Sequence, residues 1–320
     1  MPDVITFGEL LIDFVPTISG VSLAEAPAFI KAPGGAPANV AVGLARLGVP
    51  SGFMGMVGTD PFGNYLAHVL TKEGVDTSNL RFTNQARTML AFVSLKADGE
   101  RDFMFYRHPS ADMLYSPADV DPTYLKSAHI FHHGSISLIS EPSHSATMYA
   151  LEIAHKAGLI ISFDPNIRLD LWPDEDKARK EILNVWGEAH VVKASEEEVH
   201  FLSSESSIID GVRKLWGKHN QLVVVTLGKR GCAFLTVEQK GQVSGFDVQV
   251  VDTTGAGDGF VAGLLHGILE SSDTFLDEVR LKYICQYANA VGALTTRRKG
   301  AIPALPTNQE VQAFLSANSK

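Results

Sequence analysis

The chain of 320 residues has few cysteines and no excess of basic residues. Its two cysteines, Cys232 and Cys285, form no Cys-x-x-Cys pair and no disulfide framework, so we expect buried thiols in a reducing compartment. The 36 acidic residues outnumber the 27 basic ones and give a net charge of −9, which argues against DNA, RNA or another polyanion as a partner. If the protein binds a phosphate group, a local site must attract it, because the chain as a whole is negatively charged.

The sequence also lacks long apolar runs, targeting patterns and two common nucleotide motifs. No run is long enough to span a bilayer, and no leader-like segment precedes the strand-like residues 4–7, so we expect a cytoplasmic protein without membrane contacts. Gly228-Lys229 lacks the upstream glycine of a Walker-A loop. Residues 255–259 lack the spacing and early position of a dinucleotide fingerprint, which disfavours an NAD-dependent oxidoreductase.

Short apolar runs that are each followed by a helical pattern predict the fold. They occupy residues 4–7, 52–57, 160–163, 191–193 and 222–227. Continuous runs such as Leu222-Val223-Val224-Val225 are typical of parallel strands that helices cover on both faces. We therefore expect a three-layer α/β/α core with a mainly parallel sheet.

Two segments interrupt this rhythm. Residues 14–33 are rich in Pro, Ser and Ala, whereas residues 88–110 predict a hairpin with strands at 90–95 and 103–106 and a turn at 97–100. Together they predict a small β lid on a core formed by residues 1–13, 34–87 and 111–320. A small sheet that cannot bury both faces alone either covers an active site or mediates a homodimer, and the sequence leaves both open.

The most informative motif is Asp252-Thr253-Thr254-Gly255-Ala256-Gly257-Asp258-Gly259, which runs into apolar residues at helical spacing. Small residues let the backbone approach a ligand, and the free N–H groups of a first helical turn attract anions. Asp258 would repel a phosphate, so its presence indicates a general base that accepts a proton from an attacking hydroxyl. The alternative is an ordinary helix cap.

A second glycine cluster, Gly34-Gly35-Ala36-Pro37-Ala38-Asn39, directly precedes another helical pattern that ends at Gly48. The paired glycines permit close approach by a ligand. Asn39 offers an amide donor and an acceptor together, a combination suited to a sugar hydroxyl. A cap or an exposed helical residue is the alternative interpretation of Asn39.

These two motifs, with Gly48 and Gly58 after the first of them, resemble the two signatures of the ribokinase-like (PfkB) carbohydrate kinase family, and the likeness covers essentially the whole chain. Residues 8–16, 23–27, 109–114 and 300–306 are similar to plant-type fructokinases in particular. The resemblance implies a ribokinase-like fold and ATP-dependent phosphorylation of the 6-hydroxyl of D-fructose with Mg2+.

The resemblance also implies roles for individual residues. Asp258 corresponds to the catalytic base, and the anion hole corresponds to Gly255, Ala256 and Gly257. The sugar is assigned to Asp13, near the end of the first strand, and to Gly35 and Asn39. Near the reacting hydroxyl and phosphate we expect Arg107, Asp164, Asn166 and Arg168.

The nucleotide and the cations have their own implied residues. ATP corresponds to the loop that contains Thr226, Gly228 and Gly231, and to Asn289 in a flanking helix. Glu198 matches the residue that tunes hydrated Mg2+, and Asp252 and Thr254, near Gly300, resemble a K+ loop. Two positions depart from the family pattern: Ser195 stands where many relatives have Asn, and Gly259 stands where Ser or Ala is usual.

Three alternatives stay open. A 2-keto-3-deoxygluconate kinase would need a cation for the substrate carboxylate, which Arg107 could supply. A fructokinase-like scaffold without catalysis is disfavoured by the intact 255–258 loop, and a nucleoside kinase is more distant.

His129, His132 and His133 lack the spacing of a metal site, and we interpret them as strand-end or core histidines.

Overall fold

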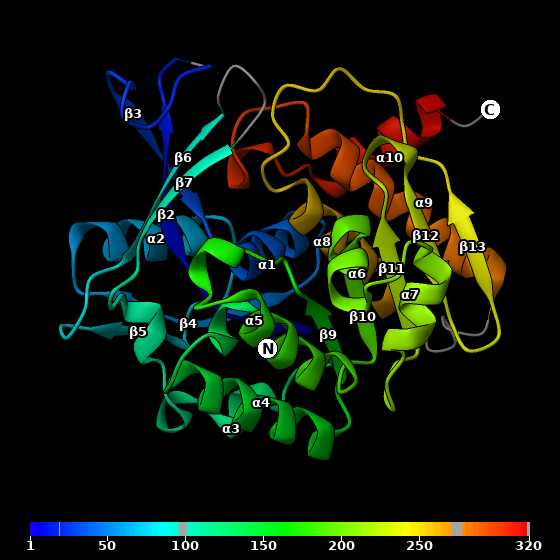
Figure 1. Ribbon diagram of the computed structural model, residues 1–320, viewed down its shortest axis with the longest axis horizontal. Helices are drawn as coiled ribbons and strands as arrows, with labels where there is room; N and C mark the ends of the chain where they lie inside the picture. Colours follow the sequence, from blue (N-terminus) through cyan, green and yellow to red (C-terminus); the bar gives the residue numbers. More distant parts are fainter. Residues whose placement is uncertain (19, 96–100, 271–276, 319–320) are drawn as a thin grey trace.

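The computed structural model describes residues 1–18, 20–95, 101–270 and 277–318. Its main sheet has nine strands: β1 (Val4–Phe7), β4 (Ser51–Gly58), β5 (Leu80–Thr83), β8 (Ile130–Gly134), β9 (Ile160–Asp164), β10 (Val191–Ser195), β11 (Leu222–Thr226), β12 (Cys232–Leu235) and β13 (Lys240–Val243). Their order is β13-β12-β11-β10-β9-β8-β1-β4-β5 (Figure 1). All neighbouring strands pair in parallel except β11 with β12 and β12 with β13. The expectation of a mainly parallel sheet is confirmed.

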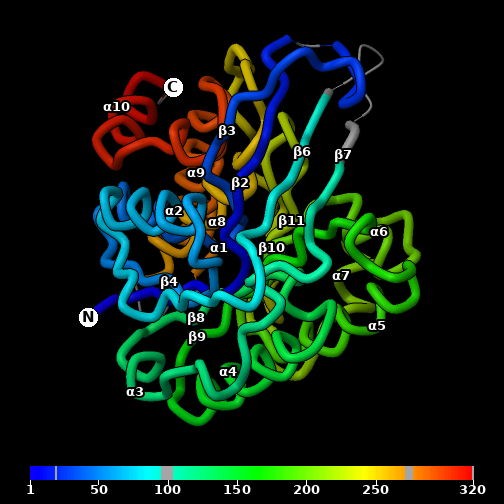
Figure 2. Tube along the Cα trace, turned by 90° about the vertical axis from the view of Figure 1, so that its left-hand side faces the viewer, coloured from blue at the N-terminus to red at the C-terminus, as the bar shows by residue number. Residues whose placement is uncertain are grey.

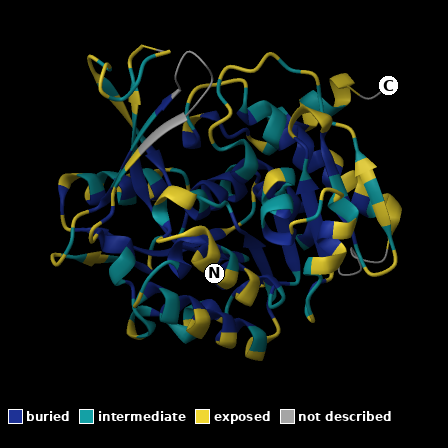
Figure 3. Cartoon of the chain, viewed as in Figure 1, coloured by how far each residue is buried: buried dark blue, intermediate teal, exposed yellow. Residues whose placement is uncertain are grey.

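Helices cover both faces of this sheet, and β11 shows the reason. Leu222, Val223, Val224 and Val225 are all inaccessible to solvent. Leu222 and Val224 belong to the apolar cluster of α1 (Ala36–Arg46), α8 (Ala256–Leu269), α9 (Glu278–Thr295) and α10 (Asn308–Asn318). Val223 and Val225 belong to the opposite cluster, with α3 (Pro122–Leu125), α4 (Ser143–Ala157), α5 (Glu175–Trp186), α6 (Glu196–Ser203) and α7 (Ile208–Leu215). The central strands therefore form the buried middle layer, dark blue in Figure 3.

A second sheet of four strands projects from the core at the upper left of Figure 1. It contains β2 (Leu11–Pro16), β3 (Phe29–Gly34), β6 (Met89–Leu95) and β7 (Arg101–Tyr106) in the order β3-β2-β6-β7, and Figure 2 shows these strands side by side. The hairpin of β6 and β7 is confirmed by antiparallel pairing, while the predicted turn at 97–100 lies outside the described residues. The placement of Asp13 near the end of the first strand was wrong, because Asp13 lies within β2 and pairs with β3.

The two faces of the small sheet differ in what they contact. Side chains of directly paired residues share a face. The face that carries Asp13 also carries an apolar group that packs against Leu171, formed by Leu11, Met89, Ala91, Val93 and Phe105. The opposite face carries ring contacts among Phe14, Phe29, Phe92 and Tyr106, and it reaches Phe62 of α2 (Pro61–Lys72). We call the face that carries Asp13 the inner face and the face that carries the aromatic contacts the outer face.

The carboxyl ends of β9, β10 and β11 lie together because the strands are parallel neighbours. They end at Asp164, Ser195 and Thr226. Ligands of open α/β sheets bind beyond the carboxyl ends of the strands, so a ligand site is expected at this edge of the sheet. The interpretation of His132 and His133 as core histidines is confirmed, because both are buried within β8. In the described part of the chain, no helix is both long and apolar enough to cross a membrane.

Candidate active site

The two glycine motifs meet in space. α1 begins after Gly35 and α8 begins after Gly255, so each motif supplies a helix N-terminus. The Nδ2 of Asn39 donates a hydrogen bond of 2.7 Å to Oδ2 of Asp258 across 219 positions of sequence. The residues assigned from separate motifs to sugar binding and to proton transfer are therefore direct neighbours.

Asp258 is buried at the third position of α8, with 8 % of its surface exposed. The pKa of its carboxyl is raised to about 6, mainly by burial and also by the nearby charge of Asp164. The hydrogen bond from Asn39 and the charges of Lys193 and Arg168 act in the opposite direction on this pKa. A carboxylate balanced in this way is ionised at neutral pH yet close enough to it to accept a proton.

The loop in front of Asp258 exposes backbone N–H groups at the start of α8, as the anion-hole prediction requires. Gly255 has φ +77° in the left-handed region, where a side chain is strained, and it packs against Ala301. The amide of Ala256 donates to Thr253, whereas the amides of Gly257 and Asp258 have no backbone acceptor among the described residues. These two N–H groups carry the positive end of the helix dipole and suit an anion.

Lys193 lies directly beside this hole. Its Nζ is 3.0 Å from Oδ2 and 3.2 Å from Oδ1 of Asp164, and both side chains are buried. A Cβ on Gly257 would lie 3.1 Å from the same Nζ, so the ammonium packs closely against this glycine. Burial lowers the pKa of Lys193, but Asp164, Glu198 and Asp258 raise it more strongly in sum, and the ammonium stays charged.

The sequence analysis did not single out Lys193. Its only sequence signal is a lysine at the third residue of an otherwise apolar strand, which is an unusual place for a charge. Its meaning depends on Asp164, Gly257 and Asp258, which other elements supply. The structure therefore adds one cation to the residues that the motifs identified.

Asp13 joins the same region from the small sheet. Its carboxylate contacts Gly34. The pKa of Asp13 is raised to about 7, mainly by burial. The charge of Arg168 lowers this pKa, and the charges of Asp258 and Asp252 raise it. Gly35, at φ +109°, leaves no room for a side chain against the Glu9 carbonyl. Asp13, Gly35 and Asn39 are thus brought together around the start of α1.

Glu9 is a second residue that the sequence analysis missed. Its Oε1 accepts a hydrogen bond of 3.0 Å from the amide of Ala36, which fixes the glycine loop at the start of α1. The pKa of Glu9 is raised to about 7, mainly by burial and also by the charge of Asp112. Glu9 therefore holds the glycine loop in position at the start of α1.

Arg107 is held by neighbours of its own. Its Nε lies 2.8 Å from Oδ2 of Asp112, and its Nη2 donates to the carbonyl of Ile136 at 3.2 Å. The pair of Arg107 and Asp112 is almost fully buried. These contacts give Arg107 a structural role, whatever it contributes to a ligand.

Asp164, Asn166 and Arg168 form the loop after β9. Oδ1 of Asp164 accepts the amide of Asn166, which has φ +41°. Glu198 fastens this loop to α6, because its Oε1 accepts the amide of Ile167 at 2.7 Å and its Oε2 accepts the amide of Ser195 at 2.7 Å. Ser195 caps α6 in return, which gives the departure from Asn a clear structural use.

The four residues assigned to the nucleotide also converge. Gly231, at φ +94°, packs closely against residues 243–245, and Asn289 of α9 donates to the carbonyls of Val243 and Ser244 at 3.3 Å. Gly228 begins a single 3-10 turn after Thr226 at the end of β11. The segment 243–245 therefore lies between the loop and α9.

The cation loop is closed by one carboxylate. Oδ1 of Asp252 accepts the amide and the hydroxyl of Thr254 at 2.9 and 2.7 Å, and Oδ2 accepts the amide of Gly300 at 2.8 Å. Asp252 thereby joins the start of the anion-hole loop to the segment after α9, and the expected proximity to Gly300 is confirmed.

Comparison with known proteins places the chain among sugar kinases. The family model described as "pfkB family carbohydrate kinase" matches residues 1–308. The chain is 53 % identical over 315 residues to Fructokinase-1 of Oryza sativa subsp. japonica, covering 98 % of each chain. A fructokinase with bound ATP from Xylella fastidiosa is 36 % identical, with a TM-score of 0.93 and 100 % coverage of both chains. A fructokinase from Vibrio cholerae O395 in a form with fructose, ADP and calcium is 37 % identical, with a TM-score of 0.88 and coverage of 98 % and 99 %.

Proposed function

The chain belongs to the pfkB family of carbohydrate kinases, and we propose that it transfers the γ-phosphoryl group of ATP to the 6-hydroxyl of D-fructose. The hydrogen bond between Asn39 and Asp258 carries this proposal. It joins an amide suited to a sugar hydroxyl to a buried carboxylate suited to proton transfer, next to N–H groups suited to phosphate. The relatives named fructokinase, at about half identity over nearly the whole chain, support fructose as the sugar.

In the proposed reaction, Asp258 accepts the proton of the 6-hydroxyl while the new O–P bond forms and the bond to ADP breaks. Asp13 and Asn39 hold the sugar hydroxyls and aim the 6-hydroxyl at the phosphorus. The amides of Gly257 and Asp258 stabilise the charge on the transferred group. Lys193 adds a positive charge at the same point, since its ammonium already lies beside Gly257.

The nucleotide and cation assignments belong to the same proposal. ATP lies along Thr226, Gly228, Gly231 and Asn289, at the carboxyl end of β11. The carboxylate oxygens of Glu198 are hard ligands of the kind that Mg2+ takes, and because each already accepts a backbone amide, contact through water is favoured. Bound Mg2+ would neutralise phosphate charge. A monovalent cation such as K+ is proposed for the loop at Asp252 and Thr254.

A 2-keto-3-deoxygluconate kinase is the remaining enzymatic alternative. It requires a cation at the substrate carboxylate, and the sequence offered Arg107 for this purpose. The Arg107 guanidinium donates hydrogen bonds to Asp112 and to the carbonyl of Ile136, which disfavours a role in binding a substrate carboxylate. An inactive scaffold has less support, because the base, the anion hole and Lys193 are all in place.

One assay separates these functions. ADP release is measured with fructose, glucose, ribose, 2-keto-3-deoxygluconate and adenosine, each with and without Mg2+. We expect turnover that requires fructose and Mg2+. Preferential turnover of the keto acid would replace the proposed substrate, and no turnover with any of the five would favour the scaffold.

The small sheet is proposed to act as a lid over the sugar and, through its outer face, as the contact of a homodimer. Asp13 on its inner face supports the lid, because the sheet itself contributes a sugar-binding side chain. The two buried, unbridged thiols of Cys232 and Cys285 support a reducing compartment such as the cytoplasm.

A further inference from the structure

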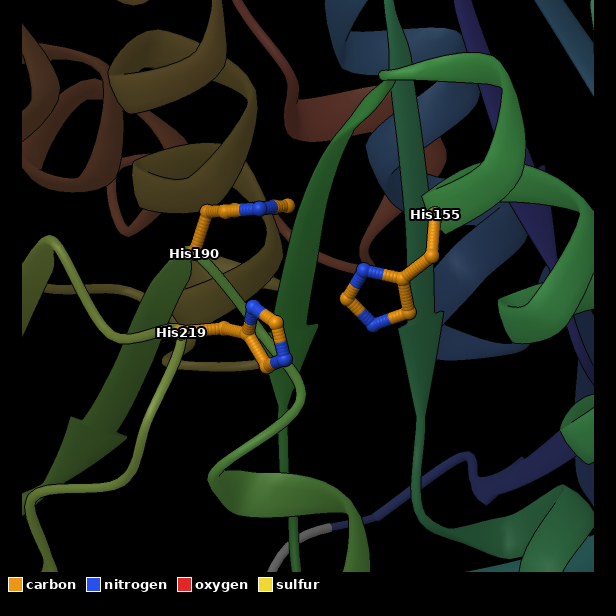
Figure 4. Close-up of side chains that lie close together, drawn as sticks. All are labelled: His155, His190 and His219. Carbon is orange, nitrogen blue, oxygen red and sulfur yellow. The ribbon is translucent and has the colours of Figure 1, made fainter.

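Three histidines that the proposed reaction does not use lie close together near the amino ends of strands of the main sheet. His155 lies in the last turn of α4, His190 directly precedes β10, and His219 lies in the segment before β11 (Figure 4). The amino ends of β10 and β11 are therefore close to this cluster, whereas the proposed active site lies at their carboxyl ends. A function in phosphoryl transfer is excluded by this placement.

The three imidazoles are close enough to share an ion. Ring centroids are 4.7 Å apart for His155 and His219, 5.6 Å for His155 and His190, and 6.0 Å for His190 and His219. One ring nitrogen of each lies within 4.8 Å of the others. In a tetrahedral complex with bonds of about 2.0–2.1 Å the ligand atoms are about 3.4 Å apart, so modest side-chain movement would complete the coordination.

Glu188 offers a candidate fourth ligand atom beside two of the three rings. Its Oε2 lies 3.2 Å from Nε2 of His155 and 3.8 Å from Nε2 of His219. The first distance permits a hydrogen bond, but Nε2 of His155 is shielded from solvent and makes no well-directed hydrogen bond to any described residue. The distance of 3.2 Å is close to the separation of about 3.4 Å expected between two ligand atoms of one tetrahedral ion.

The surroundings of His155 and His190 favour neutral rings. Burial lowers the pKa of His155 and of His190, and the neighbouring histidines lower both further, while Glu188 raises that of His155. Neutral imidazole is the form that binds a metal. A nitrogen-rich set with one carboxylate suits Zn2+ and similar transition metals, and it disfavours Mg2+ and Ca2+, which prefer oxygen.

We propose that His155, His190, His219 and Glu188 bind one divalent transition-metal ion of the Zn2+ type. One rearrangement is required. Nδ1 of His190 accepts a hydrogen bond of 2.9 Å from the amide of Ile161, so the hydrogen of its neutral ring is on Nε2, which then has no lone pair for a metal. The His190 ring must turn over when it binds, and the hydrogen bond from Ile161 is lost.

The bound ion ties α4 to the segments before β10 and β11. The segment around His219 is already held from the other side, because the amide of His219 donates to the carbonyl of Gly187. The side chain of Asn220 donates to the carbonyls of Trp186 and Ala189. The ion therefore adds a cross-link to a region whose backbone is largely fixed, and its effect is on stability rather than on turnover.

The test is a titration of the untagged full chain with Zn2+ and with Co2+ in the presence of excess Mg2+, which occupies carboxylate sites. We expect one bound ion, visible absorption of Co2+ typical of tetrahedral nitrogen ligands, and a higher Tm with Zn2+. His155→Ala and His219→Ala should each weaken binding at least tenfold and remove the Tm increase. Fructose turnover without Zn2+ should be unchanged in both variants.

His129→Ala is the matched control, because His129 also lies near a carboxylate, 3.3 Å from Asp3, but is not a member of the cluster. Its affinity for Zn2+ should equal that of the unmodified chain. A shifted amide resonance of Ile161 on saturation would report the turn of the His190 ring. The proposal is overturned if Zn2+ does not bind, or if the His155 and His219 variants bind it as tightly as the control does.

Discussion

At the scale of single residues, Asp258 concentrates both the proposed chemistry and a stability cost. Because its pKa rises from 3.8 to about 6 on folding, the native state holds its proton more tightly than the unfolded chain does. This contribution to stability is fully present below pH 3.8 and is lost as the pH rises through about 6. At neutral pH the ionised carboxylate is therefore destabilising.

Asp258→Asn should consequently be more stable than the unmodified chain and almost inactive. We expect kcat to fall by about 10²–10⁴-fold, with the Kd values for fructose and ATP changed only a few-fold. The free energy of unfolding at pH 7 should increase by up to about 3 kcal/mol, with no gain near pH 3. Denaturant titrations at both pH values, together with steady-state kinetics, measure the two effects, and wild-type turnover would refute the role of the base.

The pH dependence of turnover separates Asp13 from Asp258. Below pH of about 6 the base becomes protonated, so kcat at saturating fructose should fall tenfold for each pH unit. The value of kcat/KM reports the free enzyme, in which Asp13 takes up a proton below about pH 7. We expect kcat/KM for fructose to begin its decline one unit higher and to become steeper below pH 6. Identical profiles for the two parameters would contradict separate roles.

Lys193 is expected to stabilise the transferred phosphoryl group. Lys193→Met removes the charge beside Gly257 and leaves Asp164 buried without its partner. We expect a loss of about 10²–10³-fold in kcat, and a loss of about 3–5 kcal/mol in stability, which is typical of a broken buried pair. Circular dichroism must show the variant folded at the assay temperature. A folded Lys193→Met protein with unchanged kcat would assign Lys193 to structure alone.

Sequence motifs identified most of the site at this scale, and they failed where a role depends on distant neighbours. The motif around Asp258 predicts an anion site because a glycine loop and a helix start are local features. Lys193 and Glu9 gain their meaning from Gly257 and Ala36, which lie far away in the chain. No local pattern could have grouped His155, His190 and His219, since three separate segments bring them together.

At the scale of secondary-structure elements, α8 and α9 pack unusually closely because of three glycines spaced four apart. A Cβ on Gly259, Gly263 or Gly267 would meet Thr295, Ala288 or Ile284 of α9 at 2.6–2.9 Å. Gly259, which departs from the Ser or Ala of the family, is therefore a packing residue.

Gly263→Ala tests the packing of the two helices. Its new Cβ would lie 2.9 Å from the Cα of Ala288, which is backbone and cannot move cheaply. We expect a loss of about 1–3 kcal/mol in unfolding free energy, as for other overpacked cores, although alanine has the higher helix propensity. Gly134→Ala is the control, because its nearest neighbour would be 3.5 Å away. A more stable Gly263→Ala protein would show that propensity outweighs the contact.

Elements with regular burial were predictable, and half-exposed ones were not. Residues 222–225 are apolar because helices cover both sides of β11, and this produces an unmistakable run. The strands β2 and β3 contain Pro16 and Pro33, and their residues are buried at one end and exposed toward the other with no regular period, so their sequence shows only a break in the helical rhythm. Their pairing with β6 and β7 comes from the tertiary structure.

At the scale of the whole molecule, the outer face of the small sheet carries large apolar side chains that are partly exposed. Phe14 stacks on Phe92 with centroids 4.8 Å apart, and Phe92 in turn contacts Tyr106. Tyr106 is 57 % exposed and Met104, on the same face, is 42 % exposed. A continuous apolar face of this kind on a soluble protein marks a contact surface. Because a face of this kind can be self-complementary, a two-fold dimer is its simplest partner.

We therefore expect the protein to sediment as a dimer at micromolar concentration, and Met104→Glu with Tyr106→Glu to convert it to a monomer. Two carboxylates per subunit would face each other across the two-fold axis, where burial and like charge both oppose association. Val237→Glu serves as the control, since Val237 is 81 % exposed in the segment between β12 and β13, away from the small sheet. Sedimentation velocity distinguishes the outcomes. If the lid is completed by its partner, the monomeric variant should also show a higher KM for fructose at unchanged kcat, because Asp13 is carried by the same sheet. A monomeric wild-type protein, or a double variant that stays dimeric, would move the interface elsewhere.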